Sequence, residues 1–239
     1  MQPQNKQRDM PLRDTVYCAV MTALLIAVQV ALGFAAGVEL VTVLLLVFCY
    51  TFGVKNGVVV ATAFSLLRCL IWGFYPTVIV LYLVYFNLFA ILFGWIGTRK
   101  KIADWVAPVL LFLLLVMLGY FGATGLKVSI LMRKKITVML WILFGIVCAM
   151  ELLYAFLLVR GAKRELASLT AIAALCTVCF TLLDDIITPL MLGYSAEQAV
   201  IYFYNGFFAM IPHTVCTVVT VSALFLPLRK IFEKAAKKA

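Results

Sequence analysis

Residues 14–36 read DTVYCAVMTALLIAVQVALGFAA, an apolar run whose one charged residue, Asp14, stands at its start. A helix rises about 1.5 Å per residue, so this run can extend over about 35 Å. The hydrocarbon core of a bilayer is about 30 Å thick, and the apolar part of a cleavable signal peptide has only about 7–15 residues. The run therefore predicts a retained transmembrane helix.

The whole chain has the same apolar character. Its 239 residues are 66% hydrophobic and 13% charged, with a mean hydropathy of +1.12. Soluble chains carry about 25% charged residues, and disordered chains are poor in apolar and aromatic residues. The composition excludes both classes, and we expect an all-α polytopic membrane protein.

Breaks in the apolar runs divide the chain into eight candidate spans. The breaks include Gly53 with the following Lys55-Asn56-Gly57, the basic run 99–101 and Pro189. Short connections between spans predict antiparallel neighbours. The expected spans are residues 14–36, 39–54, 57–74, 76–97, 104–124, 137–159, 166–188 and 199–228.

Basic residues predict the orientation of these spans. The chain carries 20 Lys and Arg against 10 Asp and Glu, a net charge of +10, and most of the basic residues lie in short connections, which favours topology signals over a nucleic-acid surface. We expect a cytoplasmic N-terminal segment, residues 1–13, one transmembrane domain, residues 14–228, and a basic cytoplasmic tail, residues 229–239. Only the connection near residues 127–135 breaks the positive-inside rule, and a re-entrant path there would expose residues 160–164 outside instead.

The seven cysteines are scattered through apolar stretches, where they act as small hydrophobic residues. Cys176 and Cys179 form a C-x-x-C pair, but no histidine or second pair lies nearby to complete a zinc or redox site. We expect no metal site and no cofactor bound by this chain.

Alanine recurs at every fourth position of the first span, at residues 19, 23, 27, 31 and 35. This spacing places small side chains along one stripe of a helix. Helices associate in lipid through close backbone packing, which small residues permit. The stripe predicts a docking surface, either for a partner protein or for other helices of this chain.

Polar side chains concentrate toward the outer ends of the expected spans, where aromatic residues lie at similar depth. Charged groups within a membrane normally face a cavity or a partner because their insertion is costly. This pattern predicts a pocket that opens outside. The candidate lining residues are Gln29, Glu39, Arg68, Tyr82, Asn87, Asp184, Asp185 and Asn205.

Several of these residues also have structural interpretations. Arg68 could pair with Asp184 or Asp185 to hold helices together, and Glu39 could be a solvated loop acid. The two carboxylates of the Asp184-Asp185 doublet point about 100° apart on a helix, so one can face a pocket while the other is paired elsewhere. We expect His213 to bond a neighbouring helix, and no role is assigned to Glu151.

Three stretches resemble substrate-binding S-components of energy-coupling factor (ECF) transporters, which import vitamins and related micronutrients into bacteria. The first is the alanine stripe. The second runs from Phe52-Gly53-Val54-Lys55-Asn56-Gly57 to Gly73-Phe74-Tyr75-Pro76-Thr77. The third joins Leu183-Asp184-Asp185 with Tyr204-Asn205-Gly206-Phe207-Phe208, Pro212-His213 and Leu226-Pro227-Leu228-Arg229-Lys230.

The resemblance implies a six-helix core in the bacterial plasma membrane, with both termini cytoplasmic and a pocket near the exterior. Ala19, Ala23 and Ala27 would dock on a transmembrane coupling subunit, and Glu39 would lie in the lid after the first helix. A pair of ATPase subunits would supply ATP energy, and the sequence itself contains no G-x-x-x-x-G-K-[ST] loop. One departure is an extra hairpin at about residues 104–160.

The sequence therefore predicts a non-enzymatic binding subunit that captures a small water-soluble vitamin or related nutrient. Glu39, Asp184 and Asp185 against Arg68 favour a cationic or neutral heteroaromatic ligand. One alternative is an intramembrane enzyme that uses the aspartate doublet on a lipid phosphate, although carboxylates three or four apart would suit metal-dependent chemistry better. A self-sufficient secondary transporter is another, although no internal repeat is evident.

Overall fold

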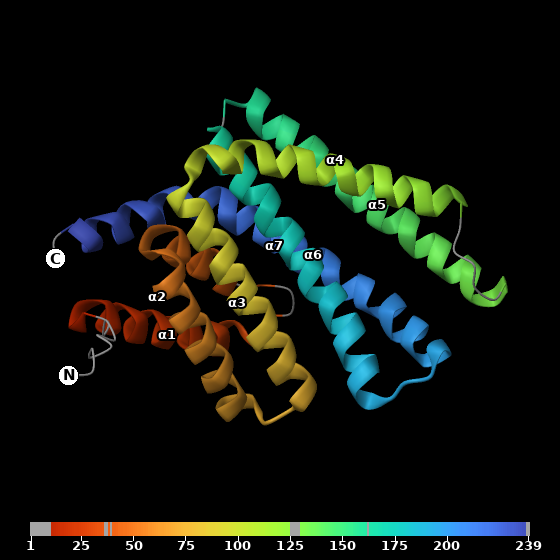
Figure 1. Cartoon of the computed structure of the whole chain (residues 1–239), viewed down its shortest axis with the longest axis horizontal. Coiled ribbons are helices and arrows are strands. Elements are labelled where there is room, and N and C mark those ends of the chain that lie inside the picture. Colours follow the sequence, from red (N-terminus) through yellow and green to blue (C-terminus); the bar gives the residue numbers. More distant parts are fainter. Residues whose placement is uncertain (1–10, 36–37, 39, 125–129, 162, 238–239) are drawn as a thin grey trace, which may run out of the picture.

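The computed structural model describes residues 11–35, 38, 40–124, 130–161 and 163–237, and within these ranges it is all-helical (Figure 1). Seven of its helices are long and apolar enough to cross a membrane, as a multi-pass membrane protein requires. The helices are α1 (Leu12–Leu32), α2 (Val41–Trp72), α3 (Pro76–Thr98), α4 (Lys100–Thr124), α5 (Ile130–Val159), α6 (Arg164–Leu192) and α7 (Ala196–Lys237).

Helix α2 reverses direction in its interior, at Gly53. The backbone there has φ 81° and ψ −179°, a conformation that glycine adopts far more readily than other residues. A Cβ atom added to Gly57 would lie 2.7 Å from Sγ of Cys49, although residues eight apart in a straight helix are separated by about 12 Å. The two parts of α2 are therefore folded back against each other.

This reversal changes the expected count of spans. The predicted spans 39–54 and 57–74 both overlap the one helix α2, and the break between them does lie at Gly53. The part before Gly53, residues 41–52, is only about 18 Å long, short of a hydrocarbon core of about 30 Å. Eight full spans are therefore not confirmed, because the second predicted span is a half-length helix.

The start of α1 and the end of α7 meet at one end of the bundle. Tyr17 donates a hydrogen bond from Oη to the carbonyl oxygen of Ala235 over 3.0 Å, and Arg13 donates one to that of Ala236 over 3.3 Å. Seven straight crossings would leave the ends on opposite sides, so the reversal at Gly53 provides the additional change of direction. Which side of the membrane this end faces stays a prediction.

The closest backbone packing joins α2 and α3. The ten residues from Val41 to Tyr50 are all buried, and Gly94 of α3 lies directly against the turn of α2. A Cβ atom on Gly94 would come 2.6 Å from the backbone nitrogen of Val54. Gly97, one turn further along, lies against the carbonyl oxygen of Tyr50. Small residues thus allow α3 to support the reversal.

A charged cluster ties three helices together near the chain ends. Arg229 of α7 donates from Nη1 to Glu165 of α6 over 2.9 Å and from Nε to Glu233 over 2.7 Å. Tyr50 of α2 donates its hydroxyl to the same Glu165 carboxylate. We call these four residues the Arg229 cluster. Since α7 continues as a helix to Lys237, the predicted tail from residue 229 begins within this helix.

Helices α4 and α5 form a hairpin on one side of the bundle (Figure 1). They pack on each other and on α3, α6 and α7. Their outer faces are apolar and exposed, as at Phe112 and Leu152, which suits contact with lipid. This pair occupies the range of the predicted extra hairpin, residues 104–160, and the connection at residues 125–129 lies outside the described residues.

We expect Gly94→Ala to destabilise the fold because the new methyl group must displace the backbone of Val54. Overpacking of this kind costs about 1–3 kcal/mol. Gly145→Ala, on α5, is the control, since nothing lies within 4 Å of its added Cβ atom. Thermal unfolding of the purified variants in detergent should show a lower transition for Gly94→Ala alone, and equal transitions would contradict this account of the α2–α3 contact.

Candidate ligand-binding cavity

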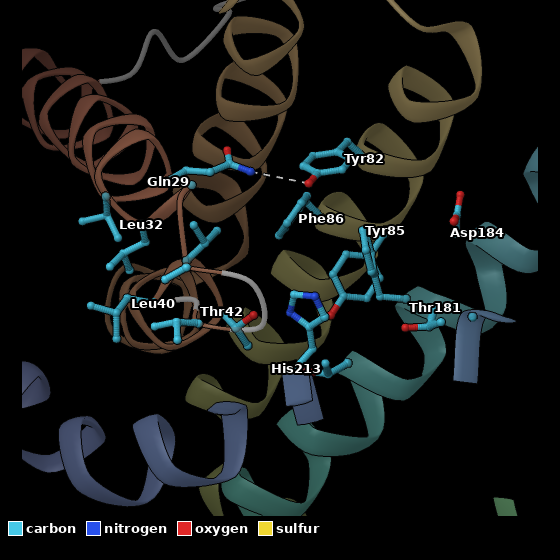
Figure 2. Close-up of a pocket in the computed structure, with 18 of the residues that line it drawn as sticks. Gln29, Leu32, Leu40, Thr42, Tyr82, Tyr85, Phe86, Thr181, Asp184 and His213 are labelled. Atoms are coloured by element: carbon cyan, nitrogen blue, oxygen red, sulfur yellow. Dashed lines mark hydrogen bonds between the residues drawn. The ribbon is translucent and has the colours of Figure 1, made fainter. Parts of the chain in front are cut away.

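A cavity of about 660 Å³ lies at the end of the bundle opposite the chain termini. It is bounded by the last turns of α1, the start of α2, the first half of α3, the middle of α6 and the first half of α7 (Figure 2). Drug-sized ligands occupy pockets of about 300–1,000 Å³. The cavity is thus large enough for a vitamin-sized molecule.

Aromatic rings form one wall of the cavity between α3 and α6. Phe180 of α6 lies with its ring centroid 4.8 Å from that of Tyr85 and 5.7 Å from that of Tyr82. The Tyr82 and Phe86 rings are themselves 5.1 Å apart. These distances are typical of favourable aromatic contacts. We call Tyr82, Tyr85, Phe86 and Phe180 the aromatic wall.

The aspartate doublet lines the cavity at the α6–α7 contact, and its two members differ. Asp184 is partnered: Thr188 donates to its Oδ1 over 2.7 Å and Tyr202 donates to its Oδ2 over 3.0 Å. Asp185 is only 5% exposed, and neither of its carboxylate oxygens has a hydrogen-bond partner among the described residues. The expected split of the doublet, with one member paired and the other left for a pocket, matches this geometry.

The carboxylate of Asp185 lies against the backbone of Gly206. A Cβ atom at Gly206 would be 2.5 Å from Oδ1 and 2.8 Å from Oδ2 of Asp185. Both residues line the cavity. A side chain at position 206 would therefore displace the carboxylate, and glycine leaves it room.

Gln29 and Arg68 approach the same aromatic residue, Tyr82. The Gln29 amide nitrogen lies 3.5 Å from the Tyr82 hydroxyl (Figure 2), while the Gln29 Oε1 atom is buried without a partner in the described structure. The Arg68 guanidinium carbon lies 4.1 Å from the centroid of the Tyr82 ring, a cation–π distance. Arg68 thus contacts the aromatic wall but is outside the cavity lining.

The structure brings five of the eight predicted lining residues to this cavity. They are Gln29, Tyr82, Asp184, Asp185 and Asn205. Asn87 lies elsewhere: it accepts a hydrogen bond from Thr62 over 2.9 Å and donates to the carbonyl oxygen of Leu83, which ties α3 to α2. Arg68 is not in an ion pair with either aspartate in the described structure. Glu39 lies outside the described residues.

Other lining residues were not among the predicted set. His213 projects from α7 toward the cavity, where a bond to a neighbouring helix was expected instead (Figure 2). Thr177 and Thr181 line the α6 side. The spacing of Thr177, Phe180, Thr181, Asp184 and Asp185 follows one helical face, a signal that could have identified these threonines from the sequence.

The alanine stripe faces away from the bundle. Ala19, Ala23 and Ala27 are exposed, as is Ala31. Helix α1 instead turns Cys18, Met21, Thr22 and Leu25 inward. Other helices of this chain therefore do not cover these four alanines. Docking of a partner protein on the stripe stays a prediction.

Comparison with family models, with curated proteins and with solved structures finds no match for this chain. The site is therefore interpreted from its own geometry. Among the described residues, no three histidine, cysteine, aspartate or glutamate side chains are grouped as a metal site would require.

We expect Tyr202→Phe to lower the thermal stability because it removes the donor to Asp184. Hydrogen bonds to charged groups contribute about 1.5–3 kcal/mol when shielded, and partial exposure of this pair reduces the loss to about 1 kcal/mol. For a chain of this size that corresponds to about 2–4 °C in Tm. Tyr75→Phe, at a ring that is 62% exposed, should leave Tm unchanged, and an equal effect of the two substitutions would refute the role of the bond.

Proposed function

We propose that this protein is the membrane-embedded substrate-binding subunit of an ECF-type importer in a bacterial plasma membrane. It captures a small water-soluble vitamin or related micronutrient from outside. The observation that carries the proposal is the cavity of about 660 Å³ at the end of the bundle away from the chain termini. With the predicted cytoplasmic termini, this end faces the exterior.

The lining suits a ligand with both polar and aromatic parts. Binding pockets combine apolar and aromatic surface with a few polar groups that fix orientation. Here the aromatic wall supplies the aromatic surface. The polar groups are those of Gln29, Asp184, Asp185, Asn205 and His213. Polar groups at membrane depth are costly unless they serve a pathway or a ligand, so their convergence on one cavity supports capture of a solute.

The exposed alanine stripe supports an association within the membrane. Ala19, Ala23 and Ala27 present small side chains outward along α1, where another helix can approach the backbone closely. In the proposal the transmembrane coupling subunit occupies this face. A pair of ATPase subunits attached to that subunit supplies the energy of ATP hydrolysis.

Identification of what remains bound to the chain tests the proposal directly. The protein is purified from its host membrane in mild detergent, and mass spectrometry identifies the retained small molecules and proteins. We expect a water-soluble nutrient, one further membrane protein and two ATPase subunits. A lipid-phosphate turnover product without ATPases would overturn the proposal in favour of an intramembrane enzyme.

We expect Ala23→Trp to abolish uptake while leaving ligand binding by the purified protein within about twofold. The bulky ring blocks close helix approach on the exposed face of α1 and lies away from the cavity. Ala155→Trp on α5 is the matched control, because Ala155 is also exposed but lies in the α4–α5 hairpin. Uptake of the retained nutrient into cells and calorimetric binding are measured for both variants. Normal uptake by Ala23→Trp, or equal loss in both variants, would exclude the docking role.

A further inference from the structure

We propose that the captured ligand is a small organic cation with a flat ring, whose positive group is bound by the carboxylate of Asp185. Its ring lies against the aromatic wall. This inference rests on the proposed function, since it names the class of molecule that the cavity takes.

Asp185 lacks a partner that its burial requires. The side chain is 95% buried, and both oxygens are shielded from solvent without a hydrogen bond in the described structure. Buried polar groups are almost always hydrogen-bonded, and an unpaired buried carboxylate is among the most unfavourable cases. The exceptions in native proteins call for a specific reason, and here the residue lines a ligand-sized cavity.

Neighbouring charges of the protein do not neutralise Asp185. Arg229 is engaged with Glu165 and Glu233 near the other end of the bundle. Arg68 lies over the rings of Tyr82 and Trp72, at 4.1 and 5.4 Å from their centroids, and is not in the lining. Within the described lining, Asp184 and Asp185 face only one basic side chain, His213. The cavity is therefore short of positive charge.

Asp184 differs from Asp185 because each of its oxygens already accepts a hydrogen bond, from Thr188 and from Tyr202. The bond from Tyr202 joins α6 to α7, whereas the bond from Thr188 lies within α6. Gly206 leaves room for the Asp185 carboxylate at the cavity edge. The arrangement thus keeps one carboxylate structural and the other free to accept an N–H donor from a ligand.

The aromatic wall explains why the cation is organic. Ring faces attract cations and stack on flat heteroaromatic groups, whereas a metal ion needs several oxygen, nitrogen or sulfur ligands around one point. No three histidine, cysteine, aspartate or glutamate side chains are grouped in this way in the described structure. A cavity of about 660 Å³ is also far larger than a bare ion requires.

Three probes of one shape and different charge test this proposal. Benzamidinium, benzamide and benzoate share a flat ring and carry positive, neutral and negative groups. Binding to the full chain in detergent is measured by calorimetry up to millimolar concentration. We expect benzamidinium to bind at least about tenfold more tightly than benzamide, since a hydrogen bond to a charged group is worth that factor or more, and benzoate to bind most weakly.

Asp185→Asn should remove the preference for benzamidinium, because the substitution keeps the shape of the side chain and deletes its charge. The same variant should unfold at a higher temperature than the wild type without ligand, since an uncompensated carboxylate has been replaced. A merely structural carboxylate would lower the unfolding temperature when replaced. Glu197→Gln, at an exposed position at the start of α7, is the matched control and should change neither property.

The proposal is overturned if benzamidinium does not bind, if benzamide or benzoate binds equally well, or if Asp185→Asn retains the preference. Calorimetric titration with NiCl₂ alone tests for a metal site. Nickel binding that is lost in Asp185→Asn would overturn the proposed organic cation in favour of a metal ion. These failures are separate from failure of the proposed function. If an anionic nutrient is retained together with ATPases, the cationic ligand is refuted and the importer function stands. If the protein selects cations but has no ATPase partner, the importer function is refuted and the cationic ligand stands.

Discussion

The high free energy of an unpartnered polar group in hydrocarbon is the constraint on which this structure depends. A chain with a mean hydropathy of +1.12 has few polar side chains to place, and several of them hold helices together. Asn87 joins α3 to α2, Thr177 joins α6 to α7 through Thr217, and the Arg229 cluster joins α2, α6 and α7. Against that background Asp185 stands out, because both oxygens of its carboxylate are buried without a partner in the described structure.

Much of the architecture could be predicted because hydropathy reports membrane crossings directly. Six of the eight predicted spans correspond to single helices, and the break at Gly53 and the hairpin at 104–160 also follow from apolar runs and their interruptions. The length of the segment before Gly53 could not be judged in the same way. Hydropathy records that residues 41–52 are apolar, but it does not distinguish a half-length helix buried among its neighbours from a complete span.

The cavity was harder to predict, since depth along a helix is readable from sequence whereas the direction of a side chain relative to its neighbours is not. Asn87 and Asp185 are both polar residues within apolar helices. Asn87 has a hydrogen-bond donor in Thr62, whereas Asp185 lies against Gly206, which has no side chain that could donate. Arg68 lies at a similar depth along its helix as the cavity, but its guanidinium lies over the ring of Tyr82 and is outside the lining. His213 was assigned to a helix contact because its estimated depth placed it far from the outer surface, whereas the cavity extends inward as far as this ring.

The placement of the α4–α5 hairpin separates the molecule into two flanks. The hairpin rests on α3, α6 and α7, while α1 lies on the other side of the bundle (Figure 1). The hairpin thus widens one flank of the bundle and leaves the α1 flank uncovered. The apolar outer face of the hairpin and the exposed face of α1 therefore meet the surrounding lipid on opposite flanks of the bundle.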